Sequence, residues 1–239
     1  MSLAGRGVVV TRPRELAEFL AARIRAAGGR PLVFPAIEIE PLPAPAALGR
    51  LDAFDLVVFV SPTAVAMAAG PLHRVRLAAV GAGTRQALER RGAQDVLAPA
   101  AGGDSEALLA LPALAAVRGR RVLIVRGEGG RALLGDTLAS RGAHVEYAEC
   151  YRRRLPAADP SALHAQWANG GVHAVTFFSA EGVDNFVKLV GAAHVRETPA
   201  FVSHERIARA AAQHGMRQTI VAGPGDAEMV DRLVAYFRP

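Results

Sequence analysis

Residues 7–29 read GVVVTRPRELAEFLAARIRAAGG, and this stretch carries the pattern that decides the fold. The run of valines is typical of a short buried β-strand, and Arg12 follows it after one threonine. The next residues have the apolar spacing of an amphipathic helix, which a glycine pair closes. Residues 7–29 therefore predict a strand, a loop and a helix in sequence. The predicted apolar face of the helix carries Leu16, Phe19, Leu20 and Ile24.

The same unit recurs to the end of the chain. Short apolar runs alternate with amphipathic segments, a pattern that favours parallel sheets covered by helices on both faces. We therefore predict an α/β fold with parallel, flavodoxin/Rossmann-like sheets. A proline-flanked segment at 31–43 has the character of an edge or crossing strand. Further strands are predicted within 54–61, 76–81, 95–99, 120–127, 144–156, 172–179, 199–203 and 218–223.

An internal repeat divides these units into two sets. Arg12 and Gly28 recur 114 residues later as Arg126 and Gly142, and both pairs belong to a strand–loop–helix–glycine–strand unit. At a spacing of 118, the serine that ends VVFVS recurs as the serine that ends VTFFS. The stretch AAVGAGTRQAL at 78–88 is matched more loosely by AFVSHERIARA at 200–210, a spacing of 122.

The order of the repeated units predicts one domain inserted into another. Two similar domains are expected to be joined by a two-stranded β-ladder, with a ligand cleft between them. The predicted outer domain is residues 1–35 and 157–239, the linker strands are 36–43 and 149–156, and the inserted domain is 44–148.

Composition narrows the classes of function. Half of the 239 residues are apolar (51%) and 21% are charged, which is typical of a globular chain. The formal charge of +6 favours an acidic partner. The basic residues are scattered, with no run longer than Arg152–Arg154, so nucleic acid is not the expected partner. We also expect no membrane partner, since no segment approaches the ~18 apolar residues of a span.

Other familiar signatures are missing from the sequence. The beginning of the chain has no signal-peptide pattern, so the expected location is the cytoplasm. The single cysteine, Cys150, excludes an internal disulfide and is expected to be a small strand residue. The histidines have no metal-binding spacing, and no dinucleotide, phosphate-loop or G-x-S-x-G motif is present. We therefore predict no metal and no cofactor.

Candidate binding residues lie where strands end, because ligands of open α/β sheets bind at the carboxyl ends of strands against helix N-termini. Each candidate also has a purely structural interpretation. The serines suit helix caps, Thr84 is a possible cap of its own helix, and the arginines suit structural ion pairs. The recurrence of the arginines at one place in both modules favours a shared ligand. The strand-end candidates are Arg12, Ser61, Gly81, Thr84, Arg126 and Ser179.

Tyr151 lies on the predicted return crossing, beside three arginines. Alternation along a strand predicts Tyr151 and Arg153 on one side and Arg152 and Arg154 on the other. A phenol near cations can donate a proton to a leaving group. The structural alternative is an ordinary half-buried strand tyrosine.

These motifs, in this order, resemble uroporphyrinogen-III synthase, in the form found in bacteria. The resemblance covers essentially the whole chain. The matching segments are VVVTRP (8–13), PAIEIEPL (35–42), FDLVVFVSPTAV (54–65), AAVGAGTRQALERRGA (78–93), 121–153, TFFSAEGVDNF (176–186) and VSHERIARAAAQHG (202–215).

The resemblance implies a cofactor-independent cyclising lyase, a hydro-lyase of haem, sirohaem and cobalamin biosynthesis. Its substrate would be hydroxymethylbilane, a linear tetrapyrrole with eight carboxylates, and its product uroporphyrinogen III, with ring D inverted and one water lost. Tyr151 matches the family tyrosine proposed to assist departure of the hydroxyl. We expect a monomer that binds this polyanion. The candidate substrate-binding residues are Arg12, Ser61, Gly81, Thr84, Arg126, Gly127, Arg153, Ser179 and His204.

One segment departs from the family pattern. Where a second G-x-x-T turn is expected, the chain has Ser203, His204 and Arg206. Two other classes of function share the predicted fold. One is a non-catalytic, hinged binder of an anionic metabolite, and the other is a nucleotide-dependent transferase, which the missing phosphate motifs disfavour.

Overall fold

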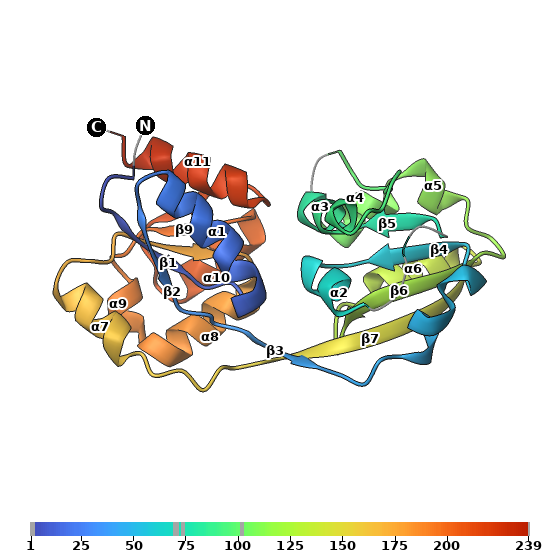
Figure 1. Ribbon diagram of the computed structural model, residues 1–239, viewed down its shortest axis with the longest axis horizontal. Coiled ribbons are helices and arrows are strands. Elements are labelled where there is room, and N and C mark those ends of the chain that lie inside the picture. The colour runs from blue at the N-terminus through green and yellow to red at the C-terminus, as the bar shows by residue number, and fades with distance from the viewer. Residues whose placement is uncertain (1–2, 69–71, 73–74, 101–102, 239) are drawn as a thin grey trace. The chain divides into compact units, whose positions relative to one another are not determined.

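The computed structural model describes residues 3–68, 72, 75–100 and 103–238, which form two compact units (Figure 1). The first, here called the outer unit, comprises Met1–Glu38 and Arg154–Pro239. The second, the inserted unit, is Ile39–Arg153. Each unit is built on its own five-stranded sheet with helices on both faces. The α/β fold with parallel sheets is therefore confirmed.

The sheet of the outer unit has the order β10-β9-β8-β1-β2, and all its neighbouring strands are parallel. The central strands are buried along their whole length, because helices cover both faces. β2, which contains Pro31, lies at the edge, where a missing backbone N–H is tolerated. The strands are β1 (Gly7–Val10), β2 (Arg30–Val33), β8 (Ala174–Phe177), β9 (Ala200–Val202) and β10 (Thr219–Val221).

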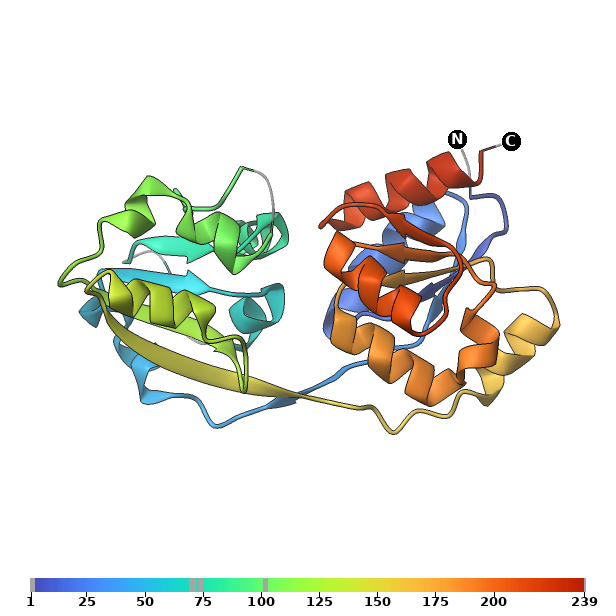
Figure 2. The same ribbon diagram turned by 180° about the vertical axis from the view of Figure 1, so that it is seen from behind.

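The helices of the outer unit form two layers. α1 (Arg14–Ala26) and α11 (Asp226–Tyr236) cover one face of the sheet, and α8 (Ala180–Val190) and α10 (Glu205–Gln213) cover the other (Figure 2). α7 (Ser161–Ala168) and α9 (Ala192–Val195) complete the unit. The predicted apolar face of α1 is wrong at Phe19, which is 51% exposed. The helix instead buries Ala17, Leu20, Ala21 and Ile24, an i, i+3, i+4, i+7 stripe.

The sheet of the inserted unit has the order β3-β7-β6-β4-β5. One layer contains η1 (Ala46–Ala53), α2 (Pro62–Met67) and α3 (Ala82–Arg90), and the other contains α4 (Ser105–Leu109), α5 (Pro112–Ala115) and α6 (Leu133–Ser140). The strands are β3 (Glu38–Pro41), β4 (Leu56–Phe59), β5 (Leu77–Ala79), β6 (Arg121–Gly127) and β7 (His144–Arg154).

The two sheets share one arrangement when the repeat is followed along them. β2-β1-β8-β9 of the outer unit corresponds to β7-β6-β4-β5 of the inserted unit. The residue pairs agree as well. Val8 pairs with Ala174, and the residues at the repeat spacings of 114 and 118, Val122 and Leu56, also pair. Even the edge is repeated: Leu97 forms an isolated parallel bridge beside β5, in the position that β10 occupies beside β9.

The pairing corrects one part of the sequence alignment. Val175 pairs with Ala200, and Val57, its counterpart 118 residues earlier, pairs with Leu77. The spacing between β5 and β9 is therefore 123, not the 122 that the sequence comparison used. The sequence comparison matched Val80 with Val202. Val202 is the last residue of β9, whereas Val80 follows the last residue of β5, so the match was wrong by one residue.

The units differ at the turn after the first repeated strand. α1 begins at Arg14, whereas its counterpart α6 begins only at Leu133, more than a turn later in the repeat. The residues between β6 and α6 include two glycines, which are poor helix formers, and Gly129 has a φ of +70°. The carboxyl edge of the inserted sheet consequently carries a loop where the outer unit has a helix.

Two segments connect the units in sequence. β3 is the neighbour of β7 in the sheet, and the Leu42 N–H donates to the carbonyl of Cys150 at 3.1 Å. The chain passes between the units at Glu38–Ile39 and again at Arg153–Arg154.

Candidate functional site

In the inserted unit, polar residues gather at the carboxyl edge of the sheet. Ser61 and Gly81 follow β4 and β5, Arg126 and Gly127 end β6, and Tyr151 lies on β7, the next strand of the sheet. Because parallel strands end at the same edge, these residues, separated by up to 90 positions, are brought to one side of the unit.

Two of the predicted site residues, Tyr151 and Ser61, are joined by a side-chain hydrogen bond at this edge. The Tyr151 hydroxyl and Ser61 Oγ are 3.0 Å apart, and Tyr151 is 2% exposed. Ser61 is the N-cap of α2, and its Oγ accepts a hydrogen bond from the Ala64 N–H at 3.0 Å. The capping interpretation of Ser61 is confirmed, and the same oxygen also contacts the phenol.

Gly127 makes room for the ring of Tyr151. A Cβ at Gly127 would lie 2.6 Å from Cε2 and 2.7 Å from Cζ of Tyr151, closer than such atoms approach. The Tyr151 carbonyl also accepts from the Glu128 N–H at 2.7 Å. Glycine at 127 is therefore required by the packing of the phenol, a role that the sequence did not indicate.

A register shift in the β6–β7 pair places the phenol where it is. Arg126 pairs with Glu149 but Gly127 pairs with Tyr151, so Cys150 is an extra residue on β7. Cys150 and Tyr151 are both buried as a result. Arg153, two positions further along the same strand, is exposed.

Cys150 is a buried strand residue, as predicted. Its Sγ lies 3.4 Å from the carbonyl oxygen of Arg126. Burial raises the pKa of the Cys150 thiol from 9.0 to about 11. The thiol is therefore protonated at neutral pH and unsuited to nucleophilic chemistry.

Arg126 forms a structural ion pair. Its guanidinium lies 2.9 Å from the carboxylate of Glu149 and 4.4 Å from the ring centroid of Tyr147, and the side chain is 14% exposed. Two contacts of this kind hold the guanidinium on β7. The ion-pair alternative is confirmed for Arg126, and the contact with Glu149 limits its availability to a ligand.

Arg12 of the outer unit is held in the same manner by different partners. It forms an ion pair with Asp226, the first residue of α11, and its guanidinium lies 4.3 Å from the ring centroid of Phe178. Both repeated arginines thus have one carboxylate and one aromatic ring beside them.

Gly81 and Thr84 lie at the start of α3. Gly81 is the N-cap residue, and a Cβ there would lie 2.8 Å from Cα of Gly103, so a close backbone approach requires this glycine. Thr84 is 4% exposed and is the third residue of the helix. The prediction that Thr84 caps the helix is wrong, because the helix starts three residues earlier than a threonine cap would require.

The outer unit carries its candidates at the corresponding caps. Ser179 is the N-cap of α8 and accepts from the Gly182 N–H at 3.0 Å. His204 is the N-cap of α10, where Nδ1 accepts from the Arg206 N–H at 3.2 Å. The neutral ring, with its proton on Nε2, is the form that accepts this bond.

The corrected spacing of 123 changes which residues of the outer unit correspond to the G-x-x-T turn of the inserted unit. His204 occupies the cap position of Gly81, and Ile207, not Arg206, occupies the position of Thr84. Both Thr84 and Ile207 are buried. The outer unit therefore has an apolar side chain where the inserted unit has a hydroxyl.

The sequence reading missed the carboxylates that hold the arginines. Glu149 lies two positions from Tyr147 on β7, and this period-two spacing could have placed both on the face of Arg126. Asp226 lies in the first turn of α11, where acidic residues are favoured, but nothing local links it to Arg12, 214 residues away.

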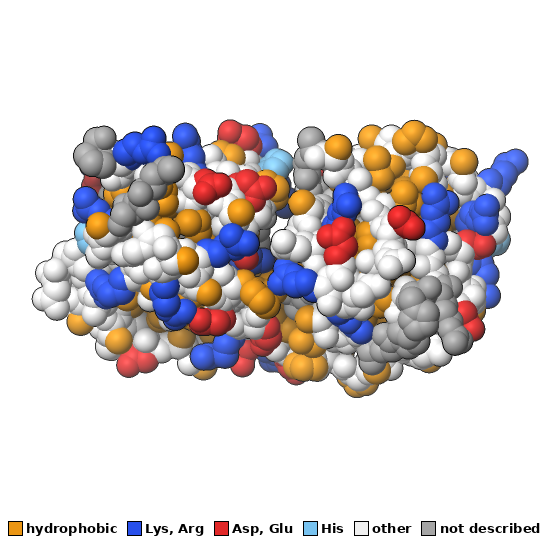
Figure 3. All heavy atoms as spheres, turned by 45° about the horizontal axis from the view of Figure 1, so that its top comes forward, with side chains coloured by type: hydrophobic (Ala, Val, Ile, Leu, Met, Phe, Trp, Pro, Cys, Tyr) orange, Lys and Arg blue, Asp and Glu red, His pale blue; other side chains and the backbone are white. Residues whose placement is uncertain are grey.

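The surface agrees with the scattered charge of the sequence. On the face drawn in Figure 3, blue and red side chains are interspersed over each unit, without a stripe of one sign among the coloured residues. Within the described residues, no helix is both long and apolar enough to span a membrane. The same residues include no group of three or more His, Cys, Asp or Glu side chains arranged to hold a metal ion.

Two α/β units, each with a parallel sheet and polar residues at its strand ends, define the structural class of this protein. Solved structures share this fold. A mutant uroporphyrinogen III synthase from the extremely thermophilic bacterium Thermus thermophilus has a TM-score of 0.59 at 23% identity, covering 97% of this chain and 99% of that one. The uroporphyrinogen-III synthetase of Helicobacter pylori 26695 has a TM-score of 0.62 at 16% identity, with both chains covered in full (100%).

Sequence relatives identify the family. The family model of uroporphyrinogen-III synthase HemD matches residues 18–231. The uroporphyrinogen-III synthase of Escherichia coli (strain K12) is 35% identical over 95% of this chain and 99% of its own. That of Salmonella typhimurium (strain LT2) is 39% identical over 73% of this chain and 76% of its own. The chain belongs to the uroporphyrinogen-III synthase family, whose members are cyclising lyases of tetrapyrrole biosynthesis.

Proposed function

We propose that this protein converts hydroxymethylbilane into uroporphyrinogen III with loss of one water. Membership of the family supports this reaction. The observation that supports a role for particular atoms is the 3.0 Å contact between the Tyr151 hydroxyl and Ser61 Oγ at the carboxyl edge of the inserted sheet. The substrate is a polyanion, in keeping with the +6 formal charge of the chain.

The first step is loss of the hydroxyl of the hydroxymethyl group. In the proposed mechanism the pyrrole nitrogen of ring A supplies electrons, the carbon–oxygen bond breaks, and the departing oxygen takes a proton to leave as water. Tyr151 donates that proton. A group that protonates a leaving oxygen in the transition state commonly contributes about 10²–10⁴ in rate.

The second step is directed by shape. The resulting azafulvene is attacked by the substituted carbon of ring D, giving a spiro intermediate that fragments and closes again with ring D inverted. Free substrate closes at the other carbon, so the protein must hold the chain in the disfavoured geometry. No buried nucleophile is needed, which suits a site whose one nearby thiol, Cys150, has a pKa raised to about 11 by burial.

Carboxylate binding is assigned to strand ends and helix caps. We propose that the substrate carboxylates are bound by N–H groups and hydroxyls at strand ends and helix caps, together with exposed arginine. Arg12 and Arg126, each already beside a carboxylate, act mainly by shaping the strand ends. The proposed substrate-binding residues are Ser61, Gly81, Thr84, Gly127, Arg153, Ser179 and His204, with Arg12 and Arg126 as positioning residues.

Freshly prepared hydroxymethylbilane tests the function directly. The protein is expected to give isomer III, separated from isomer I by liquid chromatography, whereas spontaneous closure gives isomer I. Isomer I alone at every protein concentration contradicts the proposal and leaves a non-catalytic binder, whose binding of the same substrate can be measured by calorimetry.

Charge reversal tests the binding part separately. Arg153→Glu is expected to raise KM more than it lowers kcat, because Arg153 is exposed on the strand that carries Tyr151 and would meet carboxylates, not the reacting carbon. Arg118→Glu, at another exposed position of the inserted unit, is the matched control. Equal KM values for the two variants exclude Arg153 from substrate binding.

A further inference from the structure

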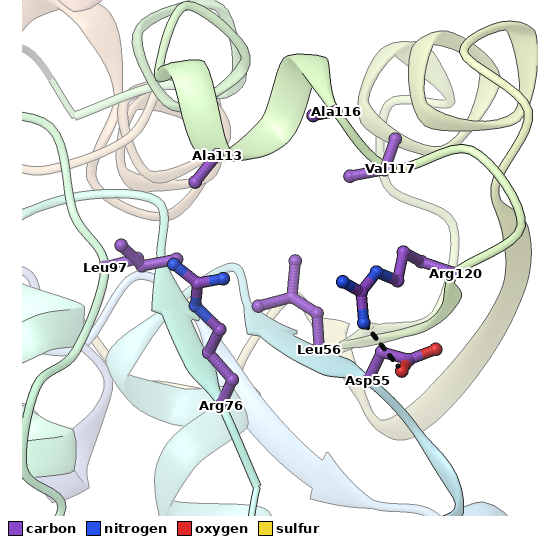
Figure 4. Close-up of a pocket in the computed structure, with 8 residues that line it drawn as sticks. All are labelled: Asp55, Leu56, Arg76, Leu97, Ala113, Ala116, Val117 and Arg120. Carbon is purple, nitrogen blue, oxygen red and sulfur yellow. Dashed lines mark hydrogen bonds and ion pairs between the residues drawn. The ribbon is translucent and has the colours of Figure 1, made fainter.

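A pocket lies at the amino edge of the inserted sheet, the edge opposite the one that carries Ser61 and Tyr151. Its volume is about 100 Å³. Leu56 and Leu97 contribute apolar side chains from the sheet side, and Ala113, Ala116 and Val117 from α5 and the residues after it (Figure 4). The walls facing each other are therefore apolar, and the small alanine side chains leave the space between them open.

Charged groups frame the same space. Arg76 precedes β5 and Arg120 precedes β6, and Figure 4 shows Leu56 between the two side chains. Asp55 is the one carboxylate among the lining residues, and its oxygens already accept from the Arg121 N–H at 2.8 Å and from Arg120 at 3.2 Å. Two guanidinium groups beside one engaged carboxylate leave an excess of positive charge.

Arg76 is the uncommitted group of the pocket. It is exposed; its backbone carbonyl accepts from the Val57 N–H at 2.9 Å, but its guanidinium makes no hydrogen bond or ion pair with any other residue that the structure describes. Arg120 uses one guanidinium nitrogen for Asp55 at 3.2 Å, which leaves further N–H donors. Both arginines can therefore donate to an anion without breaking an existing contact.

The outer unit has an aromatic ring at the position that corresponds to this pocket. Arg6 corresponds to Arg120 at the repeat spacing of 114, and its guanidinium lies 5.2 Å from the ring centroid of Phe237, just after α11. In the inserted unit, α4 and α5 form the layer that α11 forms in the outer unit, and α5 presents alanines. An aromatic ring beside the arginine is thus present in one unit and missing from the described lining in the other.

We propose that the amino-edge pocket of the inserted unit binds a small aromatic carboxylate. The ring lies between the apolar walls, where the outer unit places Phe237, and the carboxylate accepts hydrogen bonds from Arg76 and Arg120. This site is separate from the carboxyl edge that carries Ser61 and Tyr151, and it does not depend on the proposed reaction.

Benzoate is the probe, and benzamide is its neutral control of the same shape. In a titration of isotope-labelled protein followed by NMR, benzoate is expected to shift amide resonances of Leu56, Leu77 and Val117. It is expected to bind about tenfold more tightly than benzamide, the factor for one charge-assisted hydrogen bond. Equal affinities, or shifts confined to residues outside the pocket, overturn the proposal.

Two variants make the assignment specific. Arg76→Gln is expected to weaken benzoate binding about tenfold and leave benzamide unaffected, and Arg118→Gln, an exposed arginine outside the lining, is the control. Ala116→Phe is expected to fill the pocket and abolish binding of both probes. Isomer III formation is expected to be unchanged in these variants. Wild-type benzoate affinity in Arg76→Gln or Ala116→Phe overturns the site, whatever the outcome for the reaction.

Discussion

The two units share strand order and pairing register but differ beside the serine that ends the repeated strand. In the inserted unit, Tyr151 places its hydroxyl 3.0 Å from Ser61 Oγ. The corresponding residue of the outer unit is Ile37, whose Cδ1 lies beside Gly182 at the start of α8, the helix that Ser179 caps. The same position of the fold therefore has a polar contact, Tyr151 with Ser61, in the inserted unit and an apolar side chain, Ile37, in the outer unit.

This difference assigns the chemistry to one copy of the fold. Helix capping by serine is common to both units, so it belongs to the architecture. The phenol and the glycine that accommodates it occur only in the inserted unit. The outer unit has a proline, Pro13, at the position that corresponds to Gly127. The features that differ between the copies are the ones to vary experimentally.

The largest effect is expected from Tyr151→Phe. The variant makes the inserted unit resemble the outer unit in polarity while keeping the ring in place. Loss of the proton donor should lower kcat by about 10²–10⁴, with fidelity for isomer III measured in the same assay. The fold should survive, because one lost hydrogen bond costs about 1 kcal/mol.

Ile37→Leu is the matched change in the outer unit and should leave turnover unaltered. Wild-type kcat in Tyr151→Phe removes the phenol from the mechanism. A loss of activity that merely follows a loss of folded protein, measured by circular dichroism, makes Tyr151 a core residue only.

The next effect is steric. Gly127→Ala places a Cβ 2.6 Å from the ring of Tyr151, and relieving such a contact typically costs about 1–3 kcal/mol. Thermal unfolding should show this loss, and turnover should fall because the phenol moves. Gly83→Ala is the control, since a Cβ there would lie an ordinary 3.8 Å from Pro62 Cγ. Equal stability of the two variants contradicts the packing role of Gly127.

The serines allow the two roles of a cap to be separated. Ser61→Ala and Ser179→Ala each remove a side-chain acceptor at a helix N-terminus, a loss of about 1 kcal/mol in each case. Only Ser61→Ala also removes the partner of Tyr151, so only it should lower kcat beyond the change in stability. Equal kcat values in the two variants contradict a functional role for the Ser61–Tyr151 contact.

Much of the fold was predictable because its signals are local. The strands are short apolar runs, and the repeat placed Gly28 and Gly142 after equivalent helices, where they have φ values of +83° and +87°. Apolar periodicity and left-handed glycine at helix ends are properties of a few neighbouring residues. The family and its fold followed from the order of such segments.

The site was less predictable because it depends on register and distant partners. The face of Tyr151 could not be counted along β7, since the extra residue Cys150 is apparent only from the pairing with β6. The carboxylate beside Arg12 comes from Asp226 at the far end of the sequence. A one-residue shift also hid the correspondence of Thr84 and Ile207. Alternation and spacing are reliable only until a bulge or a strand end intervenes.

The amino edges of the two central strands differ in the group that accepts a neighbouring backbone N–H. Asp55 accepts a hydrogen bond from the Arg121 N–H at 2.8 Å, and His173, 118 residues later, accepts one through Nδ1 from the Gly7 N–H at 3.0 Å. The hydrogen bond from Arg121 and the contact with Arg120 lower the pKa of Asp55 from 3.8. Burial, and then the positive charge of Arg6, lower the pKa of His173 from 6.5. One position is thus filled by two groups that titrate in different ranges.

The smallest expected effect is a difference in acid sensitivity. A group with a lowered pKa in the folded state stabilises the fold above its unfolded pKa and loses that contribution as the pH falls. His173 should therefore begin to lose its contribution below about pH 6.5, and Asp55 only below about pH 3.8. His173→Asn keeps an acceptor for the Gly7 N–H but does not titrate.

The unfolding temperature of this variant should fall less than that of the wild type between pH 6.5 and 5. For Asp55→Asn, the change of unfolding temperature with pH should differ from that of the wild type only below pH 4. Parallel curves for the wild type and His173→Asn across the higher range would show that protonation of His173 does not oppose folding.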